Sequence, residues 1–180
     1  EAARTIFSRV RESGHDSSYE IHLNLANIYV SQYRLVDAIH MYQTAIRCVR
    51  YIPDLAKETS SIFDGLSAVY LQYGQFDSAV VSLIKSLHLH PVVLHNWFNL
   101  ALAREENAVS ILNRLHRSII DIQEAMCELK YASVQFSFLS EERSSLVQES
   151  GNLRCGKSKS LDHKKFCEEN FDKAEKHLFK

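Results

Sequence analysis

The chain has 180 residues, of which 46% are hydrophobic and 24% charged, with only 5 Gly and 2 Pro. So few helix-breaking residues favour helices joined by short turns over a strand-rich sandwich, and the length is sufficient for a sizeable core. The formal net charge of −1 leaves no strong field to attract nucleic acid. We therefore expect an all-α chain for which direct DNA or RNA binding is not the default function.

The four cysteines are too few and too irregularly spaced for a disulfide framework, which favours a reducing compartment. No stretch reaches the roughly 18 uninterrupted apolar residues of a membrane span. Charged residues occur within residues 1–11, where a signal peptide would need an apolar region. The sequence therefore predicts a soluble, intracellular chain with no membrane partner.

Residues 1–14 have the pattern of the second helix of a helical repeat. Ala3, Phe7 and Val10 are spaced to lie on one apolar face, and Gly14 follows as a helix stop. A solenoid unit cannot bury its apolar face alone. This leading half-repeat therefore predicts that the chain is a piece of a longer array.

Residues 20–52 contain the first full repeat. The positions that match the L-G/A-x-x-Y…A-x-x-x-F/Y-x-x-A pattern of a tetratricopeptide repeat are Leu25, Ala26, Tyr29, Ala38, Tyr42 and Ala45. Small residues in this pattern let helices approach closely, and aromatic residues fill the holes between them. We interpret these residues as core that defines the fold rather than the function.

Residues 59–91 contain a second repeat in the same frame. Its matching positions are Phe63, Leu66, Ser67, Tyr70, Ala79, Leu83, Ser86 and Pro91. From Tyr29 to Tyr70 the offset is 70 − 29 = 41 residues, against about 34 in the usual pattern. We place the extra length at residues 52–57, where Pro53 breaks a helix.

Residues 92–140 contain the third repeat, which opens with Trp97 in the phrase W-x-x-L-G/A. The tyrosine position of the pattern then holds Arg104. The second-helix pattern comes late, at Ala125, Leu129 and Ala132. We place the turn between the two helices at residues 113–118.

Residues 141–180 form a tail. We expect a short helix within residues 141–150, a loop at residues 151–160 (GNLRCGKSKS), and an amphipathic helix over residues 161–180. The apolar face of that last helix is formed by Cys167, Phe171, Ala174 and Leu178. We expect the helix to cap the last repeat, because solenoid ends need covering, and docking on a partner is the alternative.

The sequence offers little chemistry of its own. Cys155, His163 and Cys167 include zinc-ligand types, but their intervals fit no C-x-x-C pair and a fourth ligand is missing. No phosphate loop, G-x-G-x-x-G, H-E-x-x-H or G-x-S-x-G motif occurs. We therefore predict no catalytic residue, no metal and no cofactor, and hence a chain that is not an enzyme.

Four phrases are more specific than the generic repeat. They are ARTIFSRVRE at 3–12, HLNLANIYVSQYRLVDAIHMYQTAIR at 22–47, WFNLAL at 97–102 and AMCELKYASVQFSFLS at 125–140. Together they resemble the tetratricopeptide scaffold subunit, of the Ctr-nine type, of the RNA polymerase II associated factor (Paf) complex. The likeness covers residues 1–140 and is loose in the tail.

This resemblance implies an α-solenoid, a tetratricopeptide superhelix of about three repeats with a leading half-repeat and a C-terminal capping helix. It also implies a nuclear scaffold that supports transcription elongation and the methylation and ubiquitination of histones on transcribed chromatin. Its partners would be other Paf-complex subunits and the RNA polymerase II machinery. Enzyme activities would belong to those other proteins, and no small-molecule substrate is implied.

The first helix of each repeat lines the concave face of a tetratricopeptide superhelix. The residues expected to point inward there without serving the core are Asn24, Asn27, Ser31, Asp64, Ala68, Gln72, His95, Phe98, Asn99, Leu102 and Glu106. Asparagine can bracket a peptide backbone with its donor and acceptor, and an exposed Phe98 would serve as an apolar anchor. We expect partner segments to bind these residues.

Two other functions compete with this one. A chaperone cofactor would clamp a C-terminal carboxylate on this face, and Asn27 is suitably placed. However, Leu23 occupies the lysine position, and His95 and Asn99 replace the other Lys and Arg. Nucleic-acid binding through the mildly basic residues 151–180 would show a steep dependence on salt.

Overall fold

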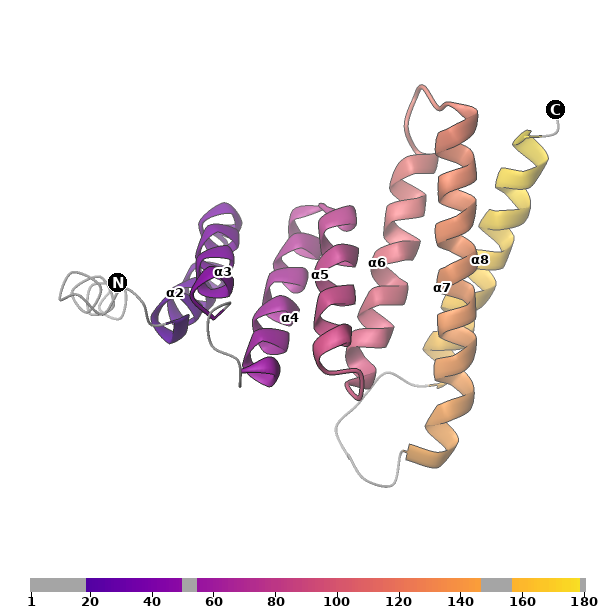
Figure 1. Cartoon of the computed structure of the whole chain (residues 1–180). Helices are drawn as coiled ribbons and strands as arrows, with labels where there is room; N and C mark the ends of the chain where they lie inside the picture. The colour runs from indigo at the N-terminus through magenta and orange to yellow at the C-terminus, as the bar shows by residue number, and fades with distance from the viewer. Residues whose placement is uncertain (1–18, 50–54, 147–156, 179–180) are drawn as a thin grey trace. The chain divides into compact units, whose positions relative to one another are not determined.

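The computed structural model describes residues 19–49, 55–146 and 157–178. The described residues form helices and turns without a strand (Figure 1). The helices are α2 Tyr19–Ser31, α3 Leu35–Val49, α4 Ala56–Tyr73, α5 Phe76–Leu89, α6 Leu94–Leu112, α7 Ile119–Leu146 and α8 Lys157–Leu178. Over this part of the chain the prediction of an all-α, solenoid-like fold is confirmed. The predicted half-repeat at residues 1–14 lies outside the described residues.

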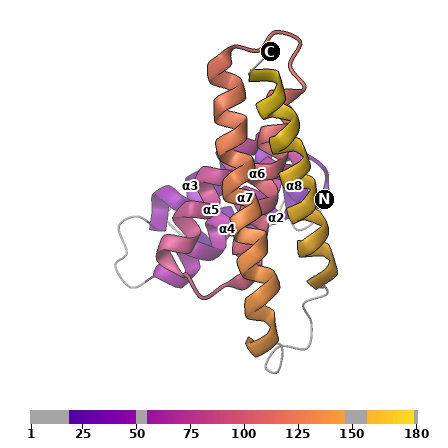
Figure 2. The same ribbon diagram turned by 90° about the vertical axis from the view of Figure 1, so that its right-hand side faces the viewer.

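The chain divides into two compact units, Glu1–Val92 and Val93–Lys180. In the first unit α2 packs against α3, α3 against α4, and α4 against α5. In the second unit α6 packs against α7, and α7 against α8, which lies beside it in Figure 2. Each helix therefore buries its apolar face mainly against its neighbours in sequence, as the members of a helical repeat do.

Two turns in the first unit have the same hydrogen bonds, 41 residues apart. The amide N–H of Tyr33 donates to the carbonyl of Val30 (3.0 Å), and that of Gly74 donates to the carbonyl of Leu71 (3.2 Å). The remaining equivalent pairs are Arg34 to Tyr29 with Gln75 to Tyr70, and Ala38 to Arg34 with Ala79 to Gln75. Both Tyr33 (φ 57°) and Gly74 (φ 78°) adopt the left-handed conformation that closes a helix. The α2–α3 and α4–α5 pairs are thus structural equivalents.

Small residues lie where these helices cross. The five alanines that the pattern predicted for close packing are all fully buried: Ala26, Ala38, Ala45, Ala79 and Ala101. The ring of Tyr42 is buried between helices, and its hydroxyl donates to Oδ1 of Asn27 on α2 at 2.6 Å. A Cβ atom on Gly65 of α4 would lie 2.8 Å from this ring. Glycine is therefore needed for the approach of α4 to α3.

The third helix pair replaces the usual tyrosine by Arg104. Its guanidinium forms an ion pair with Glu128 of α7 (Nη1 to Oε2, 3.3 Å) and lies over the ring of Tyr131, 4.9 Å from the centroid. A cation over an aromatic face is attracted by the ring quadrupole. Although Arg104 departs from the repeat pattern, it therefore still joins the first helix of the pair, α6, to the second, α7.

Several predicted boundaries were wrong and one was confirmed. The turn at residues 113–118 lies between α6 and α7 as predicted. Helix α7 continues to Leu146 because no Gly or Pro interrupts it, so the predicted break after residue 140 is absent. Helix α8 begins within the predicted loop 151–160, and Ser160 is buried. Helix α4 includes residues 56–57, and residues 52–54 of the predicted connection lie outside the described part.

The two equivalent turns predict that glycine is favoured at both positions. An L-residue in the left-handed conformation costs about 1–2 kcal/mol, and Tyr33 is 87% exposed, so it packs against little. We expect Tyr33→Gly to raise the free energy of unfolding of the first unit by about 0.5–1 kcal/mol. Thermal melting followed by circular dichroism measures this change.

The matched control is Gly74→Ala, whose added Cβ meets no atom within 4 Å. It should lower the melting temperature, because only the backbone conformation penalises it. A lower melting temperature for Tyr33→Gly would contradict the equivalence of the two turns.

Candidate functional site

The six predicted contact residues of the first unit lie mainly at the surface. Asp64 is half-buried, and the exposed ones are Asn24, Asn27, Ser31, Ala68 and Gln72. Two of the polar side chains also hold helices together, since Asn27 accepts the hydroxyl of Tyr42 and Asp64 accepts that of Ser86 through Oδ1. Only part of their hydrogen-bonding capacity is therefore open to a partner.

The five predicted contact residues of the second unit are split between surface and core. His95 and Glu106 are exposed and Asn99 is half-buried. Phe98 and Leu102 instead pack against the buried cluster shared by α6, α7 and α8. The prediction that Phe98 is an exposed anchor was therefore wrong. Its ring meets Phe136 edge-on, with centroids 5.6 Å apart, because α8 covers this part of α6.

A buried polar cluster joins α8 to α6. His163 and Cys167 lie one turn apart on α8 and both reach Glu105 of α6, which is 5% exposed. Nδ1 of His163 lies 3.0 Å from both carboxylate oxygens, and the thiol of Cys167 donates to Oε2 at 3.5 Å. The imidazole also stacks on Phe136, with centroids 5.1 Å apart. These contacts hold α8 on the preceding helix pair.

The order of groups in this cluster does not make a nucleophile. A catalytic cysteine needs a thiolate beside a base, whereas here the carboxylate lies between the thiol and the imidazole. Burial and the neighbouring carboxylate of Glu105 raise the pKa of Cys167 well above its ordinary range. The thiol therefore stays protonated and acts as a hydrogen-bond donor.

The sequence had considered His163 and Cys167 as possible zinc ligands, and had placed Cys167 on the apolar face of the last helix. Among the described residues no group of three or more His, Cys, Asp or Glu side chains is arranged to hold a metal ion, and Cys155 lies outside that part. The i, i+4 spacing of His163 and Cys167 on an apolar helix face was the available signal. Their partner Glu105 is 58 and 62 residues away in sequence, so spacing alone had no means of finding it.

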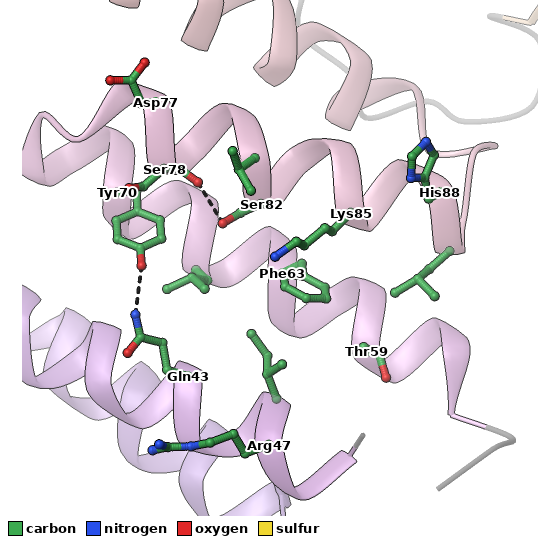
Figure 3. A pocket seen from close by; sticks show the side chains of 14 residues that line it. Gln43, Arg47, Thr59, Phe63, Tyr70, Asp77, Ser78, Ser82, Lys85 and His88 are labelled. Atoms are coloured by element: carbon green, nitrogen blue, oxygen red, sulfur yellow. Dashed lines mark hydrogen bonds between the residues drawn. The ribbon is translucent and has the colours of Figure 1, made fainter. Parts of the chain in front are cut away.

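A groove in the first unit runs between α3 and α5, with α4 as its floor (Figure 3). This α3–α5 groove has a volume of about 890 Å³. It is lined by Gln43, Ile46, Arg47, Thr59, Phe63, Leu66, Tyr70, Asp77, Ser78, Val81, Ser82, Lys85, His88 and Leu89. It is large enough to accept several side chains of a partner.

Four uncharged polar side chains of the groove floor and walls already have partners. Nε2 of Gln43 donates to the hydroxyl of Tyr70 (3.0 Å), and both lie at one end of the groove in Figure 3. The hydroxyls of Thr59 and Ser82 donate to carbonyls of their own helices. What remains for a ligand is therefore apolar surface with charged groups beside it.

The groove lies on the face of α4 opposite to the predicted contact residues. With 3.6 residues per turn, Phe63 and Tyr70 point about 170° away from Ala68 and Gln72. A prediction that used only the first helix of each repeat therefore missed it. The sequence signal for the groove was the spacing of Val81, Lys85 and Leu89, at i, i+4 and i+8. This spacing puts two exposed apolar residues, Val81 and Leu89, on one face of the second helix of the pair.

A scan against models of known protein families found none that matches this chain. None of the helices that the structure describes is long and apolar enough to cross a membrane.

The buried cluster predicts a pH dependence of stability. Burial raises the pKa of Glu105, against the opposing hydrogen bond from His163. A raised pKa means that the fold favours the protonated carboxyl. The contribution of Glu105 to stability is therefore present below its ordinary pKa and is lost as pH rises through the raised value. The Glu105→Gln variant lacks this stability contribution at every pH. We therefore expect the melting temperature of this variant, relative to wild type, to increase from pH 4 to pH 7.

Glu106→Gln is the control for this measurement, because it removes the charge of the exposed neighbour on the same helix. The increase should be larger for Glu105→Gln than for the control. Equal pH profiles for the two variants would contradict the assigned burial of Glu105.

Proposed function

We propose that the chain is a non-catalytic protein-binding scaffold built from tetratricopeptide-type repeats, and that it is part of a Ctr-nine type subunit of the Paf complex. In that role it would act in the nucleus, support transcription elongation by RNA polymerase II, and assist histone modification carried out by other proteins. Its partners would be other subunits of the same complex.

The observation that carries the repeat assignment is the equivalence of the two helix pairs of the first unit. Besides the shared turns, residues 41 apart are buried in both copies. The buried pairs are Leu25 with Leu66, Ala26 with Ser67, Ala38 with Ala79, Tyr42 with Leu83, and Ala45 with Ser86. Two copies of one helical hairpin stacked on each other are the building principle of a tetratricopeptide array.

The scaffold role is supported by the chemistry of the interior and the surface. In the buried polar cluster around Glu105, burial and the neighbouring carboxylate keep the Cys167 thiol protonated, so it does not supply the thiolate that nucleophilic catalysis needs. A helical array with an open groove presents surface to peptide segments, which is how solenoid proteins act. The phrases at 3–12, 22–47, 97–102 and 125–140 favour the Paf-complex subunit over other scaffolds.

A chaperone cofactor is the competing assignment, and the surface near Asn24 disfavours it. A hollow of about 300 Å³ there is lined by Tyr19, Glu20, Leu23, Asn24, Glu58 and Ser61. Its charged residues are both acidic, and negative charge repels the C-terminal carboxylate that a chaperone adaptor clamps. The basic side chains for such a clamp are missing from this hollow.

The proposed function predicts which proteins the chain captures. The tagged 180-residue chain, incubated with nuclear extract and analysed by mass spectrometry, should retain Paf-complex subunits. Because the net charge is near zero, the contacts should be apolar and hydrogen-bonded, so capture should persist in salt that removes an electrostatic DNA binder.

The control is a chain with Ala38→Glu, which places a charge at a fully buried helix crossing and disrupts the array. It should lose the same subunits. Capture of cytosolic chaperones without elongation factors would contradict the family assignment and favour the chaperone-cofactor function.

A further inference from the structure

The α3–α5 groove exposes apolar side chains that a soluble helix pair normally covers. Val81 is 50% exposed and Leu89 is 38% exposed, and both lie on the α5 wall. Phe63 of the floor is half-buried, and Ile46 of α3 completes the apolar lining. Burying such surface against a partner is favourable.

Basic side chains flank this apolar strip from both walls. Arg47 projects from α3, and Lys85 projects from α5 with its ammonium 5.7 Å from the centre of the Phe63 ring. Figure 3 shows the Lys85 side chain reaching over Phe63 toward the middle of the groove. Among the described residues neither Arg47 nor Lys85 has an acidic partner.

The acidic residue of the groove, Asp77, lies at a distance from Lys85. Asp77 lies in the first turn of α5, eight residues before Lys85, which is about 12 Å along the helix. His88 lies beyond Lys85, in the last turn of α5. The half of the groove around Phe63 and Lys85 is therefore positive, and a ligand with negative charge fits it best.

We infer that the α3–α5 groove is a docking site for an acidic, amphipathic segment of a partner protein. Apolar side chains of that segment pack on Phe63, Val81 and Leu89, and its Asp or Glu carboxylates pair with Arg47 and Lys85. This inference rests on the proposed scaffold function, and it moves the partner site from the predicted face of α2 and α4 to the opposite side of α4.

The occupant follows from charge and shape. The wall from Asp77 to Leu89 is about 18 Å long at 1.5 Å per residue, which suits three helical turns or five to six extended residues. A nucleic acid would meet too few cations here for tight binding. A peptide satisfies both the floor and the charges.

The test uses the full chain and a phage-displayed library of random peptides of about twelve residues, matched to the groove length. Enriched peptides should contain large apolar residues together with Asp or Glu. Synthetic fluorescent copies, measured by anisotropy, should bind Arg47→Glu/Lys85→Glu at least about tenfold more weakly than wild type. Both substituted side chains are exposed, so the melting temperature should stay near that of wild type.

Two matched variants locate the site. Val81→Asp should weaken the same peptides, because it adds a charge to the apolar wall, whereas Asn24→Ala/Gln72→Ala on the other face should leave binding unchanged. Repeating the selection on Arg47→Glu/Lys85→Glu should yield peptides in which Lys or Arg replaces the acidic residues. If the substitutions only disturbed the structure, the selected peptides would not change from acidic to basic.

Three outcomes would overturn the inference: no enriched peptide, enriched peptides without acidic residues, or peptides that lose binding only in Asn24→Ala/Gln72→Ala. Dimerisation of the wild type that Val81→Asp abolishes would assign the groove to a second copy of the chain and also overturn it. Because the library contains no Paf-complex subunit, failure here leaves capture from nuclear extract intact, and failed capture leaves the peptide result intact.

Discussion

The close approach of helices at fully buried small residues is the constraint on which the first unit depends. Ala38 and Ala79 occupy the same place in consecutive pairs, and Gly65 leaves room for the Tyr42 ring between α3 and α4. The hydroxyl of Tyr42 also donates to Asn27 on α2, so one side chain fixes the spacing of three helices. With this spacing set, α4 becomes the floor between α3 and α5, and the groove is a consequence of the packing.

The second unit buries its apolar surface in a different way. Its helices are longer than the first pair, and α8 covers the apolar edge of α6 and α7 that would otherwise lie open. The contact is specific because Glu105 is hydrogen-bonded to both His163 and Cys167 in a buried setting, where an unpaired carboxylate would be costly. The same packing covers Phe98, which was predicted to be an exposed anchor for partners.

The sequence predicted what periodicity controls and missed what tertiary contact controls. Spacing of small and aromatic residues correctly identified the buried positions of Ala38, Tyr42 and Ala79, because they recur in every copy of the hairpin. The role of Glu105 depends on α8, which is distant in sequence from α6 and has no repeat pattern. The groove was missed because its residues come from three helices, each of which looks like an ordinary amphipathic helix by itself.

The central claim is that partners of this scaffold dock in the α3–α5 groove. Photo-cross-linking in nuclear extract tests it most directly, with a benzophenone amino acid placed at Val81 in one chain and at Gln72 in another. Both positions are exposed, and they belong to opposite sides of the α4–α5 pair. The account predicts covalent adducts with an elongation-complex subunit from position 81 and none from position 72. Adducts from position 72 alone would contradict it.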